Sequence, residues 1–323
     1  MALSYEFSIG SVRARENTMF SEADAEQMLA LKSPDELVRF LKDKGYGDGD
    51  TVEEIIESNT RRMWKYIRSI APDFNIFEPF LIQNDVHNFK TVLKGTMSDR
   101  DYEHLLMEPC TVRKEDMIKA VENRRFDVFP EWLQKPADKA YQRLAETKDA
   151  RLSDAGIDRA VLERLVFLGK SSRSVFLEEY FNTLVFYANV KTVLRAVKAG
   201  VSRYFYDKAL CDCDGFDKQT AVRAALTNES ALMKYLEKID AYNCRKAMSI
   251  FAESPSKFEK FVDDELIRLA KRLCKLSSEG CEPLMGYYIG CEYERKLIII
   301  IASGLRTGTP SDKIRERLRE IYG

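Results

Sequence analysis

The chain has 323 residues, 45% of them hydrophobic and 32% charged, and its 51 Lys and Arg residues nearly balance its 52 Asp and Glu residues at a net charge of −1. This composition excludes a disordered polyelectrolyte, because the apolar side chains suffice for the core of one or two domains. It also argues against a protein that binds the phosphates of nucleic acids, since such proteins carry a clear positive excess.

The sequence predicts a soluble, cytoplasmic protein. No apolar run reaches the roughly 18 residues that span a bilayer, and the longest strongly apolar stretch runs from Leu297 to Ala302. Residues 1–6 show no basic region followed by a long apolar one, as a secretory signal would. The seven cysteines include no pair with the two-residue gap typical of zinc sites, so we expect reduced thiols without a metal.

Apolar residues recur at steps of three and four along most of the chain, which predicts an almost wholly α-helical protein. The first clear stripe follows the helix-start signal Ser33-Pro34, contains Leu37 and Leu41, and stops at Gly45. Further stripes run from Val52 to Ile70 and from Val262 to Leu273, and Thr309-Pro310-Ser311-Asp312 is a last helix-start signal.

One short segment recurs along the chain. Residues 88–94 (NFKTVLK) return 101 residues later as 189–195 (NVKTVLR), with five of seven positions identical, and a weaker third copy runs from Lys296 to Gly308. The flanks repeat as well: residues 77–81 resemble 281–285, and 96–101 resemble 18–24. The N-terminal stretch therefore resembles the downstream half of a further copy.

A period near 100 residues is too long for a solenoid of helix pairs and suits copies of a small helical bundle. We therefore predict one unit built of three helical repeats, at about residues 1–120, 121–225 and 226–323. Copies that present the same two faces to their neighbours can close into a ring with pseudo-threefold symmetry.

Sequences that resemble nucleotide or metal motifs lack essential positions. Gly169-Lys170-Ser171 follows a helical stretch and has Arg164 where a phosphate-binding loop needs glycine. Asp212, Asp214 and Gly215 lack the first and twelfth ligands of a calcium loop. We expect neither a cofactor nor a metal.

The two histidines, His87 and His104, lack a catalytic partner at a recognisable spacing, so His87 is either a polar packing residue or a general base. Asn88, Lys90, Asn189 and Lys191 place polar groups near the start of otherwise apolar segments. They either bond to neighbouring helices or face a shared central opening where a partner binds.

The repeated segments Asp85–Gly95, Tyr187–Thr192 and Glu292–Leu297, with Val12–Glu16 near the N-terminus, resemble the C subunit family of V/A-type rotary ATPases, whose eukaryotic counterpart is the d subunit of the V-ATPase. The resemblance covers essentially the whole chain. It departs from the family at Lys296 and Ile298, where the third copy usually has Asn and then Arg.

The resemblance implies an all-α funnel of three similar bundles that is not an enzyme. Such a subunit lies on the cytoplasmic face of the membrane rotor ring of c-, K- or L-type proteolipid subunits, receives the D and F subunits of the central stalk, and transmits torque between ATP turnover and proton or sodium transport. Its partner contacts are assigned here to His87, Asn88, Lys90, Asn189, Lys191 and Lys296.

Two alternatives remain open from the sequence. One is a helical enzyme of the isoprenoid-synthase type with Asp263 and Asp264 as magnesium ligands, although Ile267 stands where a further carboxylate is needed. The other is a helical scaffold that binds peptides in one large apolar groove.

Overall fold

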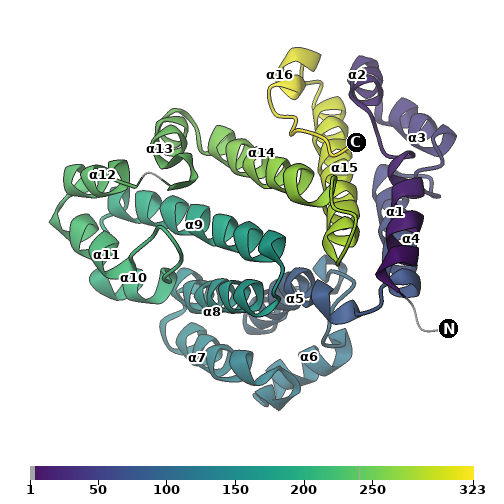
Figure 1. Cartoon of the computed structure of the whole chain (residues 1–323). Helices are drawn as coiled ribbons and strands as arrows, with labels where there is room; N and C mark the ends of the chain where they lie inside the picture. Colours follow the sequence, from purple (N-terminus) through teal and green to yellow (C-terminus); the bar gives the residue numbers. More distant parts are fainter. Residues whose placement is uncertain (1–3, 240) are drawn as a thin grey trace. The chain divides into compact units, whose positions relative to one another are not determined.

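A computed structural model describes residues 4–239 and 241–323 and confirms the expected all-α fold (Figure 1). Within these residues no strand forms, and Cys213 and Phe216 make an isolated β-bridge. The α-helices are α1 (Tyr5–Glu16), α2 (Glu22–Ala30), α3 (Pro34–Asp43), α4 (Val52–Ile70), α5 (Glu78–Ser98), α6 (Lys114–Glu122), α7 (Glu131–Thr147), α8 (Ala150–Ser171), α9 (Val175–Lys198), α10 (Arg203–Ala209), α11 (Lys218–Thr227), α12 (Glu229–Glu237), α13 (Cys244–Glu253), α14 (Pro255–Cys274), α15 (Glu282–Arg306) and α16 (Ser311–Arg315). Short 3-10 helices span Phe74–Phe77, Glu103–Leu105, Phe126–Val128 and Ala241–Asn243.

The predicted helix ends are largely confirmed. The Ser33 hydroxyl accepts a hydrogen bond from the Glu36 amide at the start of α3, and Pro34 is its first residue. Beyond its end, Gly45 adopts a φ of 65°, which favours glycine. The last start signal is only partly right, because α16 begins at Ser311 behind Pro310 and no side chain caps it.

The chain forms two compact units, one of residues 1–74 with 249–323 and one of residues 75–248, with the division inside α13. In the first unit, the long helix α15 packs against α14 and α16 and also against α1, α2, α3 and α4 from the other end of the chain. Phe20, Leu37 and Ile55 share one core with Ile298 and Ile301 of α15. The N-terminal segments thus complete the hydrophobic core that surrounds the C-terminal helix α15.

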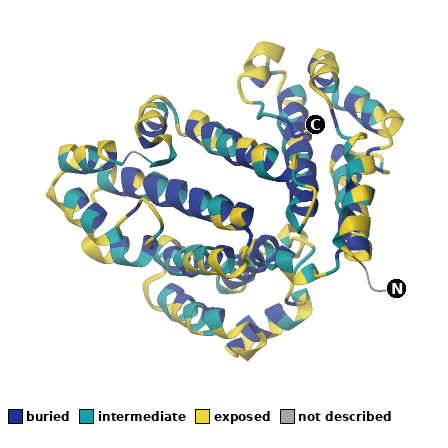
Figure 2. Ribbon diagram, in the orientation of Figure 1, coloured by how far each residue is buried: buried dark blue, intermediate teal, exposed yellow. Residues whose placement is uncertain are grey.

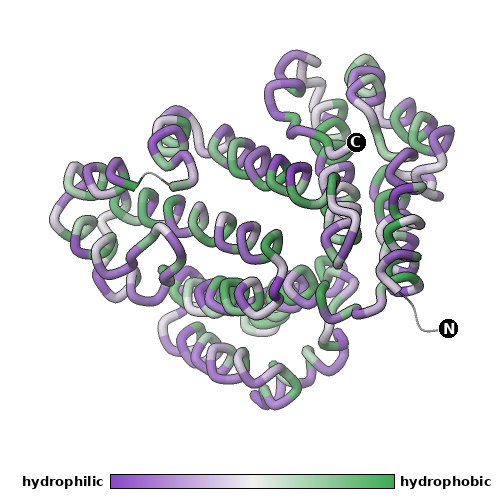
Figure 3. The backbone as a smooth tube through the Cα atoms, viewed as in Figure 1, coloured by the Kyte–Doolittle hydropathy of each residue, from purple (hydrophilic) through white to green (hydrophobic). Residues whose placement is uncertain are grey.

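The second unit is arranged around α5, α8 and α9. Helices α7 and α8 form an antiparallel pair, α8 also packs against α5, α9 and α10, and α11 packs against α9 and α12. Phe80 and Phe181 meet with their ring centroids 5.4 Å apart. Figure 2 shows α9 and α15 buried along much of their length, and in Figure 3 both helices carry many hydrophobic residues.

Candidate functional site

The first copy of the repeated segment lies in α5, where Asn88 is fully buried. Its Oδ1 accepts a hydrogen bond from the Met107 amide at 2.7 Å, and its Nδ2 donates to the Met107 carbonyl oxygen at 2.9 Å. One turn earlier, the Asp85 carboxylate accepts bonds from the amides of Thr111 and Val112. Polar side chains of α5 therefore fix the segment that follows it.

Asn189 of α9 makes the same two bonds in the second copy. Its Oδ1 accepts from the Cys211 amide at 3.2 Å and its Nδ2 donates to the Cys211 carbonyl oxygen at 2.8 Å. Two turns earlier, Asn182 forms an equivalent pair of bonds with the backbone of Asp214. Burial raises the pKa values of the Cys211 and Cys213 thiols to about 12, so both stay protonated near neutral pH.

The third long helix, α15, holds a distant segment through a carboxyl group, that of Glu294, which lies two residues before the start of the third copy at Lys296. Glu294 is 6% exposed, and its Oε1 accepts a hydrogen bond from the Phe20 amide at 2.5 Å. Burial raises the pKa of Glu294 to about 7; the bond from Phe20 lowers it in part, and the nearby charge of Asp24 raises it further. Each of the three long helices thus holds another chain segment through at least one buried polar side chain.

A cavity of about 860 Å³ in the second unit is lined by residues of α5, α8, α9 and α10. Three of the predicted partner-binding residues, His87, Lys90 and Lys191, lie on its wall. Lys90 Nζ lies 2.6 Å from an Asp158 carboxylate oxygen, and His87 Nε2 lies 3.1 Å from the Leu105 carbonyl oxygen. The structure therefore brings together residues from the first and second copies.

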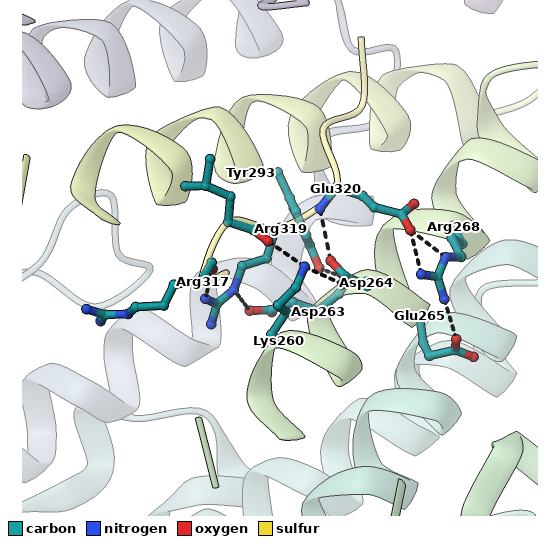
Figure 4. A network of polar contacts seen from close by, with 10 residues as sticks. Lys260, Asp263, Asp264, Glu265, Arg268, Tyr293, Arg317, Arg319 and Glu320 are labelled. Carbon is teal, nitrogen blue, oxygen red and sulfur yellow. Dashed lines mark hydrogen bonds and ion pairs between the residues drawn. The ribbon is translucent and has the colours of Figure 1, made fainter. Parts of the chain in front are cut away.

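Lys296, the predicted residue of the third copy, takes part in a polar network of the first unit (Figure 4). Its Nζ lies 2.6 Å from Asp263 Oδ1, while Arg319 Nε lies 2.9 Å from Asp263 Oδ2. The neighbouring Asp264 accepts bonds from the Lys260 ammonium and from the Glu320 amide. This network ties α14 to α15 and to the C-terminal segment.

The network argues against the isoprenoid-synthase alternative, in which Asp263 and Asp264 would bind magnesium. The two carboxylates proposed as magnesium ligands instead bind basic side chains of this chain, and Asp264 also accepts a hydrogen bond from a backbone amide. In residues 4–239 and 241–323, no three His, Cys, Asp or Glu side chains lie close enough together to hold a metal ion. Gly169, Lys170 and Ser171 form the last turn of α8, which is not a phosphate-binding loop.

Comparison with known proteins decides the family. A family model described as ATP synthase (C/AC39) subunit matches residues 8–317, nearly the whole chain. The chain belongs to this family. The C subunit of an A-type ATP synthase from Halorubrum lacusprofundi is 23% identical, with 97% of each chain covered. The C subunit of a V-type sodium ATPase from Enterococcus hirae is 19% identical over 96% of this chain and 97% of its own.

A third relative, the C subunit of the A-type ATP synthase of Methanothermobacter thermautotrophicus, is 25% identical over 95% of this chain and 86% of its own. The C/AC39 chain is accordingly a non-catalytic subunit of a V/A-type ATPase, as the repeated segments indicated. In the part of the chain that the structure describes, no helix combines the length and apolar character of a transmembrane segment.

The structure divides the six predicted residues of this C/AC39 chain into two kinds. Asn88 and Asn189 are buried and bonded to backbone, which is the packing role that the sequence left open beside partner binding. His87, Lys90, Lys191 and Lys296 are at least partly exposed. Glu294 was not among the predicted residues. An acidic residue within a long apolar helix could have indicated that it has a buried partner.

Proposed function

We propose that this chain is the rotor adaptor of a V/A-type ATPase, which joins a D/F-type shaft to the proteolipid ring and transmits torque between them. The observation that carries the proposal is the shared arrangement in α5, α9 and α15, where at least one buried polar side chain holds a distant or following segment. In this proposal the adaptor is peripheral to the membrane, on its cytoplasmic face.

The same arrangement supports three helical repeats arranged as a funnel around a pseudo-threefold axis. In two copies the held segment follows the long helix, at Met107 and Cys211, while in the third it is Phe20 from the N-terminus. The third repeat would then be assembled from both ends of the chain, as the likeness of residues 18–24 to residues 96–101 suggests.

Torque transmission requires a body that does not deform under load. Close-packed helices provide stiffness, because their interdigitated side chains cannot slide without opening voids. Buried bonds between long helices and loops add to it, since breaking one leaves an unpaired polar group in the core. Asn88, Asn189 and Glu294 supply such bonds.

We assign the shaft contact to the cavity bounded by α5, α8, α9 and α10, which carries His87, Lys90 and Lys191. The test is binding of the purified full chain to a D/F complex, measured by surface plasmon resonance. We expect submicromolar affinity, at least tenfold weaker for Lys191→Glu, since reversing a charge on a contact surface repels the partner. Lys65→Glu, an exposed site in the other unit, is the matched control.

Absence of D/F binding at micromolar concentration would overturn the rotor proposal as a whole. Equal losses in Lys191→Glu and Lys65→Glu would instead remove the cavity as the contact surface. Capture of an unrelated apolar peptide in the same cavity, with no affinity for D/F, would favour the peptide-binding scaffold.

A further inference from the structure

A second groove, of about 480 Å³, lies between α7 and α8 and shares only Leu152 with the lining of the larger cavity. Six of its lining residues are basic and one, Glu163, is acidic. The whole chain has a net charge of −1. Positive charge is therefore concentrated in this groove, although the chain as a whole is almost neutral.

Basic residues converge on the groove from both helices. Lys135, Lys139 and Arg143 lie four residues apart along α7 and therefore share a face. Arg159 and Arg164 line the groove from α8. Neither Lys135 nor Lys139 forms an ion pair with any of the described residues, so their repulsion is not relieved within the chain.

The walls also contain hydrogen-bond donors without acceptors. In the described residues the buried indole nitrogen of Trp132 and the Nε atom of Arg164 have no hydrogen-bond partner, and Arg159 Nε, also without a hydrogen bond, forms an ion pair with a Glu163 carboxylate oxygen at 3.4 Å. The outer nitrogens of the two arginines are anchored, on the Asp207 carbonyl oxygen and on Glu78, each at 2.8 Å. Because buried donors are nearly always paired, a small side-chain shift toward an entering acceptor would lower the free energy.

Aromatic rings and a glycine shape the rest of the groove. The Arg164 guanidinium lies 5.2 Å from the ring centroid of Phe167, which is 57% exposed, and 5.9 Å from that of Trp132. A Cβ placed on Gly156 would meet nothing within 4 Å, so the groove wall is open at this point of α8. The groove thus has a recess beside its cationic walls.

We propose that this groove binds a small anion with two or more phosphate groups. Guanidinium groups donate in a planar fork that matches phosphate oxygens, while the lysines add positive charge. The volume lies in the range of small-molecule sites and is too small for a partner helix. This site is separate from the proposed shaft contact, so either proposal can fail without the other.

The test is isothermal titration calorimetry of the full chain with sodium tripolyphosphate at 50 mM salt. We expect micromolar affinity that falls as salt rises, because phosphate binding releases and competes with counterions. Lys139→Glu should weaken binding at least tenfold. Lys65→Glu, which makes the same change at another exposed lysine, should have less than a twofold effect.

A second variant tests the shape of the site without changing its charge. Gly156→Leu places a side chain in the open part of the groove and should abolish binding while the melting temperature is maintained, since α8 tolerates a Cβ there. Affinity weaker than millimolar, equal losses in the two lysine variants, or full binding by a folded Gly156→Leu protein would each overturn the proposal.

ATP in place of tripolyphosphate identifies the source of the phosphates. A tenfold tighter complex with ATP would support a nucleotide whose base stacks on Phe167 or Trp132. Equal affinities would support inorganic polyphosphate as the ligand.

Discussion

Asn88 on α5, Asn189 on α9 and Glu294 on α15 each hold another chain segment through hydrogen bonds of a buried side chain, and we call each such contact a clamp. The clamps on α5 and α9 differ from the clamp on α15 in one chemical respect. Asn88 and Asn189 each use a neutral amide, which donates to one backbone carbonyl and accepts from the amide of the same residue. Glu294 only accepts, from Phe20, and its carboxyl is almost wholly buried. The two amide side chains therefore cannot titrate, whereas Glu294 is an ionisable group in the core, as Asp85 is beside Asn88 on α5.

The difference shows how a single chemical group alters a shared arrangement. An amide satisfies both backbone groups of the segment it holds and leaves no charge to desolvate. A carboxylate in the same setting loses the solvation of its charge, which is why the pKa of Glu294 rises to about 7. We therefore expect the attachment of Phe20 to α15 to respond to pH near neutrality.

The largest effect is expected from removing an amide clamp. Asn189→Leu would leave the amide and carbonyl groups of Cys211 unpaired in a buried site and should lower the free energy of unfolding by about 2 to 5 kcal/mol. Urea denaturation followed by circular dichroism measures it. Asn123→Leu, the same change at an exposed position, should cost less than about 0.5 kcal/mol. Equal costs at the two sites would mean that the clamp contributes nothing.

Converting an amide clamp into a carboxyl clamp tests the comparison directly. In Asn189→Asp the ionised side chain would face the carbonyl oxygen of Cys211, whereas the protonated form can still donate to it. We expect a loss of about 3 kcal/mol at pH 8 and a clearly smaller one at pH 5. A loss that is the same at both pH values would show that the charge is solvated.

The carboxyl clamp itself should make stability depend on pH. The pKa of Glu294 is higher in the folded chain, at about 7, than its ordinary value of 4.5, so the folded state binds the proton more tightly. Its stabilising contribution is complete below pH 4.5 and is lost as the pH rises through 7, by at most about 3 kcal/mol.

Glu294→Gln is the matched variant, because its amide oxygen can still accept from Phe20 without carrying a charge. Unfolding titrations between pH 5 and pH 8 should show the decline in the parent chain and a flatter profile in the variant. A variant that declines as steeply as the parent would assign the dependence to another group.

The smallest effects concern the lysines of the first and third copies. Lys296 pairs with Asp263, whose side chain is 17% exposed and also binds Arg319, while Lys90 pairs with the half-exposed Asp158. Asp263→Asn should therefore cost about 1 kcal/mol and Asp158→Asn less than about 0.5 kcal/mol, because exposed ion pairs contribute little. Thermal melts of both variants measure the difference, and the opposite order would contradict it.

Much of the local structure followed from the sequence. The stripe from Val52 to Ile70 coincides with α4, and the start at Ser33-Pro34 with that of α3, because spacing and capping act within a few residues. The recurrence of the Asn88 segment at Asn189 also indicated that the two would play equivalent parts, and both form the same pair of backbone bonds.

The direction of each side chain and its partners required the tertiary structure. Asn88 and Lys90 stand two residues apart, yet one points into the core toward Met107 and the other lines a cavity, because neighbouring helices decide which face of α5 is covered. The meeting of Phe20 with Glu294, and of the basic faces of α7 and α8, depends likewise on packing between segments. Helical periodicity is a local property, whereas the contacts of a helix face are set by the whole fold.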